Sequence, residues 1–263
     1  MAVIMRRMKV VILAGGHGTR LAEETEVRPK PMVDIGGRPI LWHIMKHYAR
    51  HGFKEFIVAL GYRGEDIKRF FLDQVTLSGD LTVRLAERSV DRRHVEEDDW
   101  TVHLVDTGLA TSTGGRVGRL ADRLADGPFM LTYGDGVSNV DLGALVAHHQ
   151  ASDRLATLTA VRPGSRFGGL SFDDGDAVRF IEKPQIGEGW VSGGFMVLEP
   201  EVLSYIDGDA SSFELNVLEP ISHEGKLGAY RHEGFWQSMD NIRDVRYLRS
   251  LWAANEAPWR TWE

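Results

Sequence analysis

The stretch from residue 13 to residue 37, LAGGHGTRLAEETEVRPKPMVDIGG, has the residue types and the spacing best suited to chemistry in this sequence. Its glycines let backbone N–H groups approach the oxygens of an anion, and Arg20 and Lys30 add positive charge. Pro29 and Pro31 restrict the backbone on both sides of Lys30, which leaves the ammonium group little freedom of direction. These features predict a binding site for a nucleoside polyphosphate.

Two common phosphate-binding loops do not account for this stretch. The Walker pattern G-x-x-x-x-G-K-[ST] does not occur in it, and a dinucleotide fingerprint that starts at Gly16 has Leu21 where its third glycine is required. A nicotinamide-dependent oxidoreductase is therefore disfavoured as an alternative. A tight glycine turn without chemical function is a second alternative for the glycines alone, and the Pro-Lys-Pro that follows disfavours it.

The composition narrows the class of protein. The 263 residues, 43% of them hydrophobic, are enough for one large core. The formal net charge of -7 disfavours a nucleic acid or an anionic membrane as a partner. With no cysteine there is no disulfide, thiolate zinc site or thiol nucleophile, so we expect any metal to have oxygen ligands. The apolar run at 10–14 is too short for a signal peptide or membrane span, and we expect a cytoplasmic protein.

Hydrophobic patterns along the chain predict alternating strands and helices. Apolar runs predict strands at 9–14, 55–60 and 128–136. Helices are expected at 39–52, 65–74, 116–125 and 141–151, and Asp141 is suited to cap the last. Half-exposed strands are expected at 81–86 and 100–106, with a solvent loop at 87–99 between them. Further strands at 155–163, 169–175, 177–184 and 190–200 precede a final helix at 241–257.

This order predicts an α/β fold in which helices cover both faces of a doubly wound, mixed but mainly parallel sheet, with a small β-rich subregion. The glycine-rich stretch follows the first strand and therefore lies at the carboxyl edge, where such sheets bind ligands. No repeat or linker divides the chain. We expect a single domain over 8–263, with 1–7 as a flexible N-terminal extension.

An ordered series of motifs resembles the sugar nucleotidyltransferase family. It begins with L-A-G-G-x-G-T-R-L and P-K-P-M and continues through VDTG at 105–108, TGGR at 113–116, YGDG at 133–136, EKP at 182–184, SGGF at 192–195 and GFWQSMD at 234–240. The TGGR, the FWQ-x-MD and the closing APWRTWE are similar to the cytidylyltransferase branch. The resemblance covers nearly the whole chain from Met8. It implies the three-layer, Rossmann-like nucleotide-diphospho-sugar transferase fold.

The resemblance also implies a reaction and a site. CTP and a sugar 1-phosphate, with glucose 1-phosphate foremost, give a CDP-sugar and pyrophosphate by in-line attack on the α-phosphorus, with Mg²⁺ as cofactor. The implied catalytic residues are Arg20 and Lys30, and the implied metal ligands are Asp135 and Asp240. The implied nucleotide-binding residues are Leu13, Ala14, Gly15, Gly16, Gly18, Thr19, Thr113, Gly114, Arg116 and Gly134. The implied sugar-phosphate-binding residues are Glu182, Lys183, Ser192, Gly193 and Gly194. A homo-oligomer is also expected.

Simpler interpretations stand beside several of these roles. Asp135 in Gly-Asp-Gly also suits a turn, and Asp240 also suits the N-cap of the final helix. Gly114 suits a plain helix start, and Arg116 an exposed helix charge. The histidines at 43, 47, 51, 148 and 149 are expected on helix surfaces, and the Trp-rich end is expected to pack at a subunit or domain contact rather than on a base.

Three positions depart from the family pattern. The family usually has Asn where this chain has Ser192, Pro where it has Ser238 and Thr where it has Asn241. All three lie near the expected sugar or metal end, so they bear on which sugar is used. The same chemistry with another sugar phosphate or pyrimidine triphosphate, and a silent nucleotide-binding relative, are the alternatives.

Overall fold

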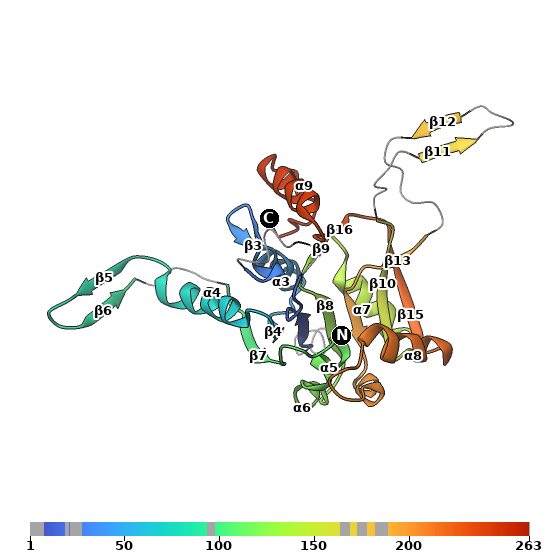
Figure 1. Ribbon diagram of the computed structural model, residues 1–263, viewed down its shortest axis with the longest axis horizontal. Helices are drawn as coiled ribbons and strands as arrows, with labels where there is room; N and C mark the ends of the chain where they lie inside the picture. The colour runs from blue at the N-terminus through green and yellow to red at the C-terminus, as the bar shows by residue number, and fades with distance from the viewer. Residues whose placement is uncertain are drawn as a thin grey trace.

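A mixed sheet of eight strands forms the centre of the molecule, with the order β13-β10-β14-β8-β1-β4-β7 and β15 paired to β10 (Figure 1). The computed structural model describes residues 8–18, 21, 28–93, 98–163, 169–172, 178–181 and 189–262, with backbone only at 169–172 and 178–181. The strands of this sheet are β1 Val10–Leu13, β4 Glu55–Leu60, β7 Thr101–Asp106, β8 Phe129–Tyr133, β10 Ala156–Val161, β13 Val191–Ser192, β14 Met196–Leu198 and β15 Leu227–His232.

Among the described residues, four two-stranded pairs lie outside the main sheet. They are β2 Asp34–Ile35 with β3 Arg38–Pro39, β5 Leu81–Arg84 with β6 Ser89–Arg92, β9 Gly136–Ser138 with β16 Trp236–Ser238, and β11 Gly169–Phe172 with β12 Val178–Ile181. The α-helices are α3 Ile40–Arg50, α4 Gly64–Leu77, α5 Thr113–Gly118, α6 Ala121–Leu124, α7 Leu142–Gln150, α8 Glu219–His223 and α9 Ile242–Ala253. 3-10 helix forms at η2 Lys30–Met32 and η3 Pro200–Tyr205, and a π-helix, η4, spans Glu214–Leu218.

Successive residues of the central strands enter two separate hydrophobic cores. Val10 and Ile12 of β1 pack into one core with α3, α7 and α9, whereas Val11 and Leu13 pack into the other with α5, α6, η4 and α8. Figure 1 shows α3 and α9 on one side of the sheet and α5 and α6 on the other. Because side chains alternate across a strand, a sheet with apolar residues at every position needs cover on both faces. The predicted three-layer, mainly parallel α/β fold is confirmed.

The strand directions bring one set of strand ends to a common edge. β1 is parallel to β4 and β8, and β4 is parallel to β7. β14 is antiparallel to both β8 and β10, so β10 and its parallel neighbour β15 run in the same direction as β8. The carboxyl ends of all these parallel strands therefore lie together. This edge is where the loop after β1 and the residues after β8 emerge.

The predicted elements are confirmed in the first half of the chain except at two places. The expected solvent loop at 87–99 contains a strand, β6, because residues 81–92 fold back as a hairpin in which Val83 pairs with Val90. The expected helix at 116–125 is two short helices, α5 and α6, and α5 starts at Thr113, three residues earlier than predicted. Asp141 caps α7 as predicted, since its carboxylate accepts a hydrogen bond from the N–H of Ala144 at 2.9 Å.

In the second half of the chain, the structure contains strands that the hydrophobic pattern of the sequence did not predict. The expected strand at 190–200 is two strands, β13 and β14, because Gly194 and Phe195 have positive φ values of 74° and 44° that interrupt the extended backbone. β15 and β16 had no predicted counterpart. The expectation of a single domain over 8–263 stays a prediction, and the expected N-terminal extension at 1–7 lies outside the described residues.

Three histidines expected on helix surfaces are buried. His43, His47 and His149 are between 0% and 2% exposed. The Nε2 of His43 lies 2.8 Å from the carbonyl of Ile35, and the Nδ1 of His149 lies 2.8 Å from Thr157 Oγ1. The surface expectation failed because these helices are covered by other elements that the helical pattern could not reveal.

The C-terminal end explains the burial of two of these histidines. Trp259 is 1% exposed, stacks on Phe235 and lies edge-on to His43. His47 Nδ1 lies 3.0 Å from the hydroxyl of Thr261. The Trp-rich end therefore packs inside the same chain, against α3.

Candidate active site

A cavity of about 670 Å³ opens at the carboxyl edge of the sheet. Its walls come from the loop after β1, from the segment before α5, from the end of β8 and from two segments late in the chain. The lining residues are Leu13, Ala14, Gly15, Gly16, His17, Gly18, Lys30, Pro31, Leu109, Ala110, Thr111, Ser112, Thr113, Arg116, Tyr133, Gly134, Asp135, Ser212, Glu214 and Asp240. The volume is in the range of sites that hold a small organic ligand.

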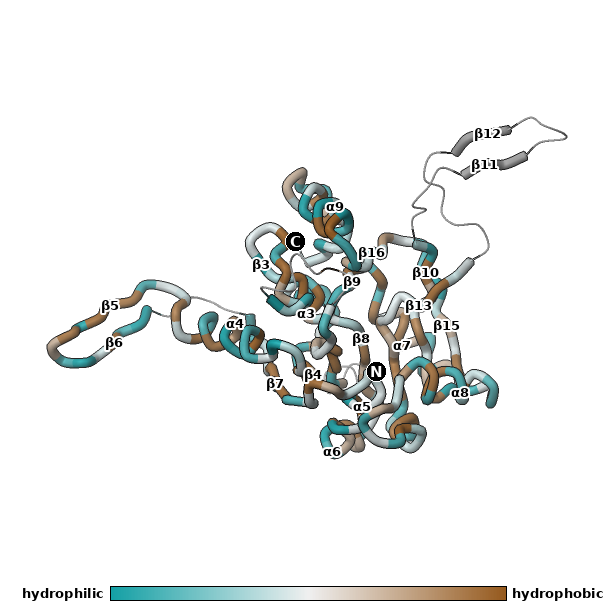
Figure 2. Tube along the Cα trace, in the orientation of Figure 1, coloured by the Kyte–Doolittle hydropathy of each residue, from teal (hydrophilic) through white to brown (hydrophobic). Residues whose placement is uncertain are grey.

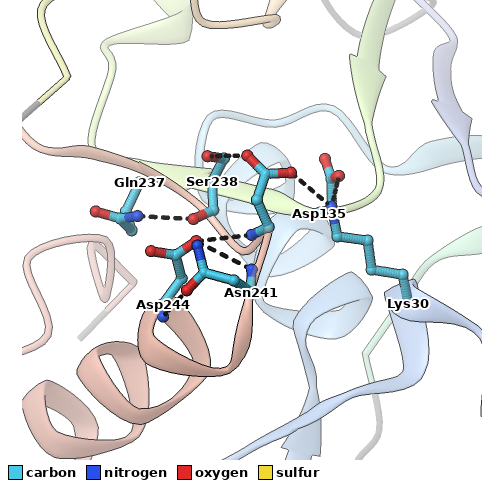
Figure 3. A network of polar contacts seen from close by, with 7 residues as sticks. Lys30, Asp135, Gln237, Ser238, Asn241 and Asp244 are labelled. Atoms are coloured by element: carbon cyan, nitrogen blue, oxygen red, sulfur yellow. Dashed lines mark hydrogen bonds and ion pairs between the residues drawn. The ribbon is translucent and has the colours of Figure 1, made fainter. Parts of the chain in front are cut away.

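Lys30 joins the two aspartates that the sequence singled out. Its Nζ lies 2.6 Å from Oδ2 of Asp135 and 2.9 Å from Oδ1 of Asp240, as Figure 3 shows. These contacts cross 105 and 210 residues of sequence. Pro29 caps η2 with extended backbone and Pro31 is buried, so the backbone of Lys30 is held at the cavity wall.

Asp240 is held from several directions. Ser238 donates its hydroxyl hydrogen to Oδ2 of Asp240 at 2.9 Å, and the N–H of Asp240 donates to Asp244 at 2.9 Å (Figure 3). The alternative in which Asp240 caps the last helix is wrong. The cap is Asn241, whose side chain accepts hydrogen bonds from the N–H groups of Arg243 and Asp244 in a capping box. The cap one residue later leaves the carboxylate of Asp240 to face Lys30.

Arg116 anchors the glycine-rich loop from beneath. The residue is only 4% exposed. Its guanidinium donates hydrogen bonds to the carbonyls of Gly15 at 3.0 Å, Leu60 at 2.9 Å and Gly108 at 2.7 Å, and to the hydroxyl of Thr107 at 2.8 Å. The interpretation of Arg116 as an exposed helix charge is wrong, because α5 points this side chain into the space under the loop. A Cβ on Gly15 would lie 2.2 Å from Nη1, which requires glycine there.

Two cationic side chains, Lys30 and Arg116, line the cavity beside its carboxylates. Burial lowers the pKa of Lys30, but the adjacent carboxylates of Asp135 and Asp240 outweigh it and hold the pKa above its ordinary value. Lys30 is therefore an ammonium at neutral pH. Burial also lowers the pKa of Arg116, which stays charged because a guanidinium pKa starts far above neutrality. A positive charge under the loop and a second beside it suit phosphate oxygens.

Tyr133 and Glu214 form a second polar group in the cavity that sequence reasoning missed. Glu214 accepts hydrogen bonds from the hydroxyls of Tyr133 at 2.6 Å, Thr113 at 2.8 Å and Ser212 at 2.8 Å. Burial raises the pKa of Glu214, but these hydroxyl donors outweigh it and hold the pKa below its ordinary value. Tyr133 stands in the quoted YGDG motif, whereas no motif marks Glu214. The carboxylate ties the end of β8 to the start of α5.

Known proteins resemble this chain over nearly its whole length. A family model described as Nucleotidyl transferase matches residues 9–258. Glucose-1-phosphate cytidylyltransferase of Salmonella typhi is 48% identical over 257 residues, which are 97% of this chain and 100% of the relative. Probable glucose-1-phosphate cytidylyltransferase of Bacillus subtilis is 40% identical over 256 residues, again 97% of this chain and all of the relative. The chain belongs to the nucleotidyl transferase family.

Solved structures support the fold of this nucleotidyl transferase. The crystal structure of HddC from Yersinia pseudotuberculosis superposes with a TM-score of 0.69 at 23% identity, over 93% of this chain and 99% of that one. At that identity the likeness concerns the fold alone. Within the described residues, no helix is long and apolar enough to span a membrane.

The structure brings most of the predicted site residues of this nucleotidyl transferase to one cavity. Lys30, Asp135 and Asp240 line it with eight of the predicted nucleotide-binding residues, which are Leu13, Ala14, Gly15, Gly16, Gly18, Thr113, Arg116 and Gly134. Gly114 lies outside the lining and starts α5 against the backbone of Ser211. Ser192, Gly193 and Gly194, in and after β13, are also outside the lining. Thr19, Arg20, Glu182 and Lys183 lie outside the described residues.

The residues around Lys30 fit a divalent metal. In the described part of the chain no group of three or more metal-binding side chains occurs. Two carboxylate oxygens nevertheless converge on one cation, the ammonium of Lys30, at 2.6 and 2.9 Å. Mg²⁺ in phosphate-binding sites is usually held by one or two carboxylates together with phosphate oxygens and water. Asp135 and Asp240 are such a pair of carboxylates.

Proposed function

We propose that this nucleotidyl transferase joins CTP and α-D-glucose 1-phosphate to give CDP-glucose and pyrophosphate. The observation that carries the proposal is the convergence of Lys30, Asp135 and Asp240 at the edge of a cavity floored by the glycine-rich loop. The full-length likeness to glucose-1-phosphate cytidylyltransferases supports the choice of substrates.

In the proposed reaction an oxygen of the sugar phosphate attacks the α-phosphorus of CTP. The new phosphorus–oxygen bond forms as the bond from the α-phosphorus to the bridging oxygen of the β-phosphate breaks, and pyrophosphate leaves with that electron pair. Bringing two anions together is the main barrier. The backbone N–H groups of the loop at 15–18 bind phosphate oxygens, and Lys30 donates hydrogen bonds to the reacting phosphates. Arg116 lowers the cost of this negative charge from beneath the loop.

Asp135 and Asp240 would hold Mg²⁺, which when bound neutralises charge on the α-phosphate and on the leaving pyrophosphate. We also propose that Arg20 and Thr19 bind the triphosphate and that Glu182 and Lys183 bind the sugar phosphate, as the family motifs imply. Ser192 to Gly194 are proposed to form the wall beside the sugar. Tyr133 lies close to this wall, since its ring is 3.1 Å from the position of a Cβ on Gly194.

Pyrophosphate release tests the proposed function. Purified protein with MgCl₂ is assayed against CTP, UTP, dTTP and GTP, each paired with glucose 1-phosphate, mannose 1-phosphate or galactose 1-phosphate, and the nucleotide sugar is identified by mass spectrometry. We expect release with CTP and glucose 1-phosphate. Pyrophosphate release with CTP and a sugar phosphate other than glucose 1-phosphate would support the proposed mechanism but change the proposed sugar substrate. Silence with every pair would support the nucleotide-binding relative that does not catalyse.

We further propose a cytoplasmic homo-oligomer. The β5–β6 hairpin extends beyond the end of α4 and carries hydrophobic residues on β5 (Figure 2). Val83, Leu85 and Val90 are 56%, 85% and 62% exposed, and an isolated hairpin with such a surface gains from burial against another subunit. Size-exclusion chromatography with light scattering tests this, and a monomer at micromolar concentration would contradict it.

A further inference from the structure

Lys30 lies at the position that a cation between Asp135 and Asp240 would take. Its ammonium is within 3 Å of one oxygen of each carboxylate (Figure 3). A metal ion bound to these two oxygens would place two positive groups at nearly the same point. Like charges at a few ångströms repel strongly in a partly buried site, so the ammonium and the metal exclude each other.

We propose that Lys30 acts as the counter-ion of Asp135 and Asp240 in the substrate-free protein, that a divalent metal must displace its ammonium to bind there, and that the phosphates of the incoming nucleotide favour this exchange by offering Lys30 a new partner. This exchange rests on the proposed function, because it takes the two aspartates as metal ligands. It assigns Lys30 a second role before the reaction. It also predicts that the nucleotide strengthens metal binding.

The local backbone allows this exchange with a side-chain movement alone. The N–H of Met32 donates to the carbonyl of Pro29 at 2.8 Å, and the N–H of Val33 donates to that of Lys30 at 3.1 Å. The backbone at Lys30 is thus held, while the side chain is a flexible four-carbon stem with an ammonium at its end. Gly15 to Gly18 line the same cavity, so phosphates bound to this loop offer the ammonium a new partner nearby.

The carboxylate of Asp240 and the backbone of Asp135 are also held by contacts other than those with Lys30. Oδ2 of Asp240 accepts the hydrogen bond from Ser238, while Oδ1 faces Lys30. The N–H of Met239 donates to the backbone carbonyl of Asp135 at 2.8 Å, which joins the two segments that carry the aspartates. These contacts remain when the ammonium leaves, so the segments that carry the two aspartates stay joined. Ser238, a departure from the family pattern, has this positioning role.

Binding of Mn²⁺ to the protein without nucleotide, measured by electron paramagnetic resonance, tests the exchange. Lys30→Met should bind one Mn²⁺ at least about tenfold more tightly than the wild type, because it removes the competing cation and keeps both carboxylates. Lys46→Met is the matched control. It makes the same charge change at an ion pair with Asp98, 2.6 Å in length, on another part of the surface, and should leave Mn²⁺ binding unchanged.

A second substitution shows where the metal binds. Adding Asp135→Asn to Lys30→Met should remove the gain, because one of the two oxygen ligands loses its charge. Equal Mn²⁺ affinity in the wild type and Lys30→Met, with both folded by circular dichroism, would overturn the exchange. A gain that persists in the double variant would place the metal elsewhere and would also overturn it.

A measurement on the wild type does not depend on the folding of any variant. Brief acetylation with acetic anhydride, followed by mass spectrometry, reports how accessible each lysine amine is. Acetylation of Lys30 should rise several-fold as Mn²⁺ is raised without nucleotide, while Lys46 and Lys54, paired with Asp98 and Asp99, serve as internal references. Mn²⁺ binding with unchanged Lys30 acetylation would overturn the exchange. Neither measurement uses turnover. Failure of the wild type to form CDP-glucose would therefore refute the proposed function without deciding the exchange.

Discussion

Replacement of Arg116 by methionine tests whether this residue supports the nucleotide-binding loop. The change keeps a side chain of similar length but removes the donors that now bind the carbonyls of Gly15, Leu60 and Gly108. The carbonyls of Gly15 and Leu60 keep donors from Tyr62 and Thr107, so the loss comes mainly from the hydrogen bonds of the charged guanidinium, each worth about 1.5–3 kcal/mol. Allowing for relaxation and for water that reaches part of the site, we expect a loss of about 3–5 kcal/mol in the free energy of unfolding.

Urea unfolding and a thermal melt measure this loss. For a chain of this size, the expected destabilisation lowers the melting temperature by on the order of 10 °C. The KM for CTP should rise as well, because the loop loses both its support and the charge beneath it. Arg119→Met is the matched control one turn along, where the guanidinium pairs with the exposed carboxylate of Asp209, and it should leave both measurements nearly unchanged.

A melting temperature of Arg116→Met within about 2 °C of the wild type would refute the reasoning. In that case the guanidinium would not support the loop, whatever the effect on CTP. A large loss of stability with an unchanged KM for CTP would limit Arg116 to a structural role.

Three further predictions concern the loop, the metal ligands and the buried histidines. Gly15→Ala should lower stability and CTP binding, because its Cβ would lie 2.2 Å from the guanidinium of Arg116. The control is Gly16→Ala, whose Cβ would meet nothing within 4 Å and which should melt like the wild type. Equal melting temperatures of the two variants would contradict the steric account. Asp135→Asn should abolish pyrophosphate release with the fold intact by circular dichroism, and near-normal release would remove Asp135 from the proposed metal site. Burial lowers the pKa of His43 to about 4 and of His47 to about 3 from an ordinary value of 6.5, so the unfolded chain takes up protons first as the pH falls. The stability from these neutral histidines is complete above pH 6.5 and is lost below it, by up to about 1.4 kcal/mol per pH unit for each, until the folded pKa is reached. Urea unfolding at pH 7 and pH 5 should show a smaller difference for His47→Gln than for the wild type, and an equal difference would contradict this assignment.

The local pattern of the sequence was sufficient for much of the fold. β1, β4 and α3 are strongly apolar or strongly periodic, and glycine or proline marks their ends, so their type does not depend on distant contacts. The same holds for the cap at Asp141, which needs only its own helix. The motifs around Lys30 and Asp135 likewise pointed to the cavity, since residues after parallel strands meet at one edge.

Only the tertiary structure decided which side chains meet. Nothing near Lys30 in the sequence indicates that its ammonium contacts Asp135 and Asp240, 105 and 210 residues away, because that contact depends on the order of strands in the sheet. For the same reason Arg116 could be taken for an exposed charge until α5 was placed beneath the loop. Glu214 lies in a π-helix without a local signal, and its function as an acceptor for Tyr133 and two other hydroxyls exists only once three segments are packed together. Residue types and short-range order therefore determined the elements and the class of chemistry, and long-range packing determined the partners of each charged group.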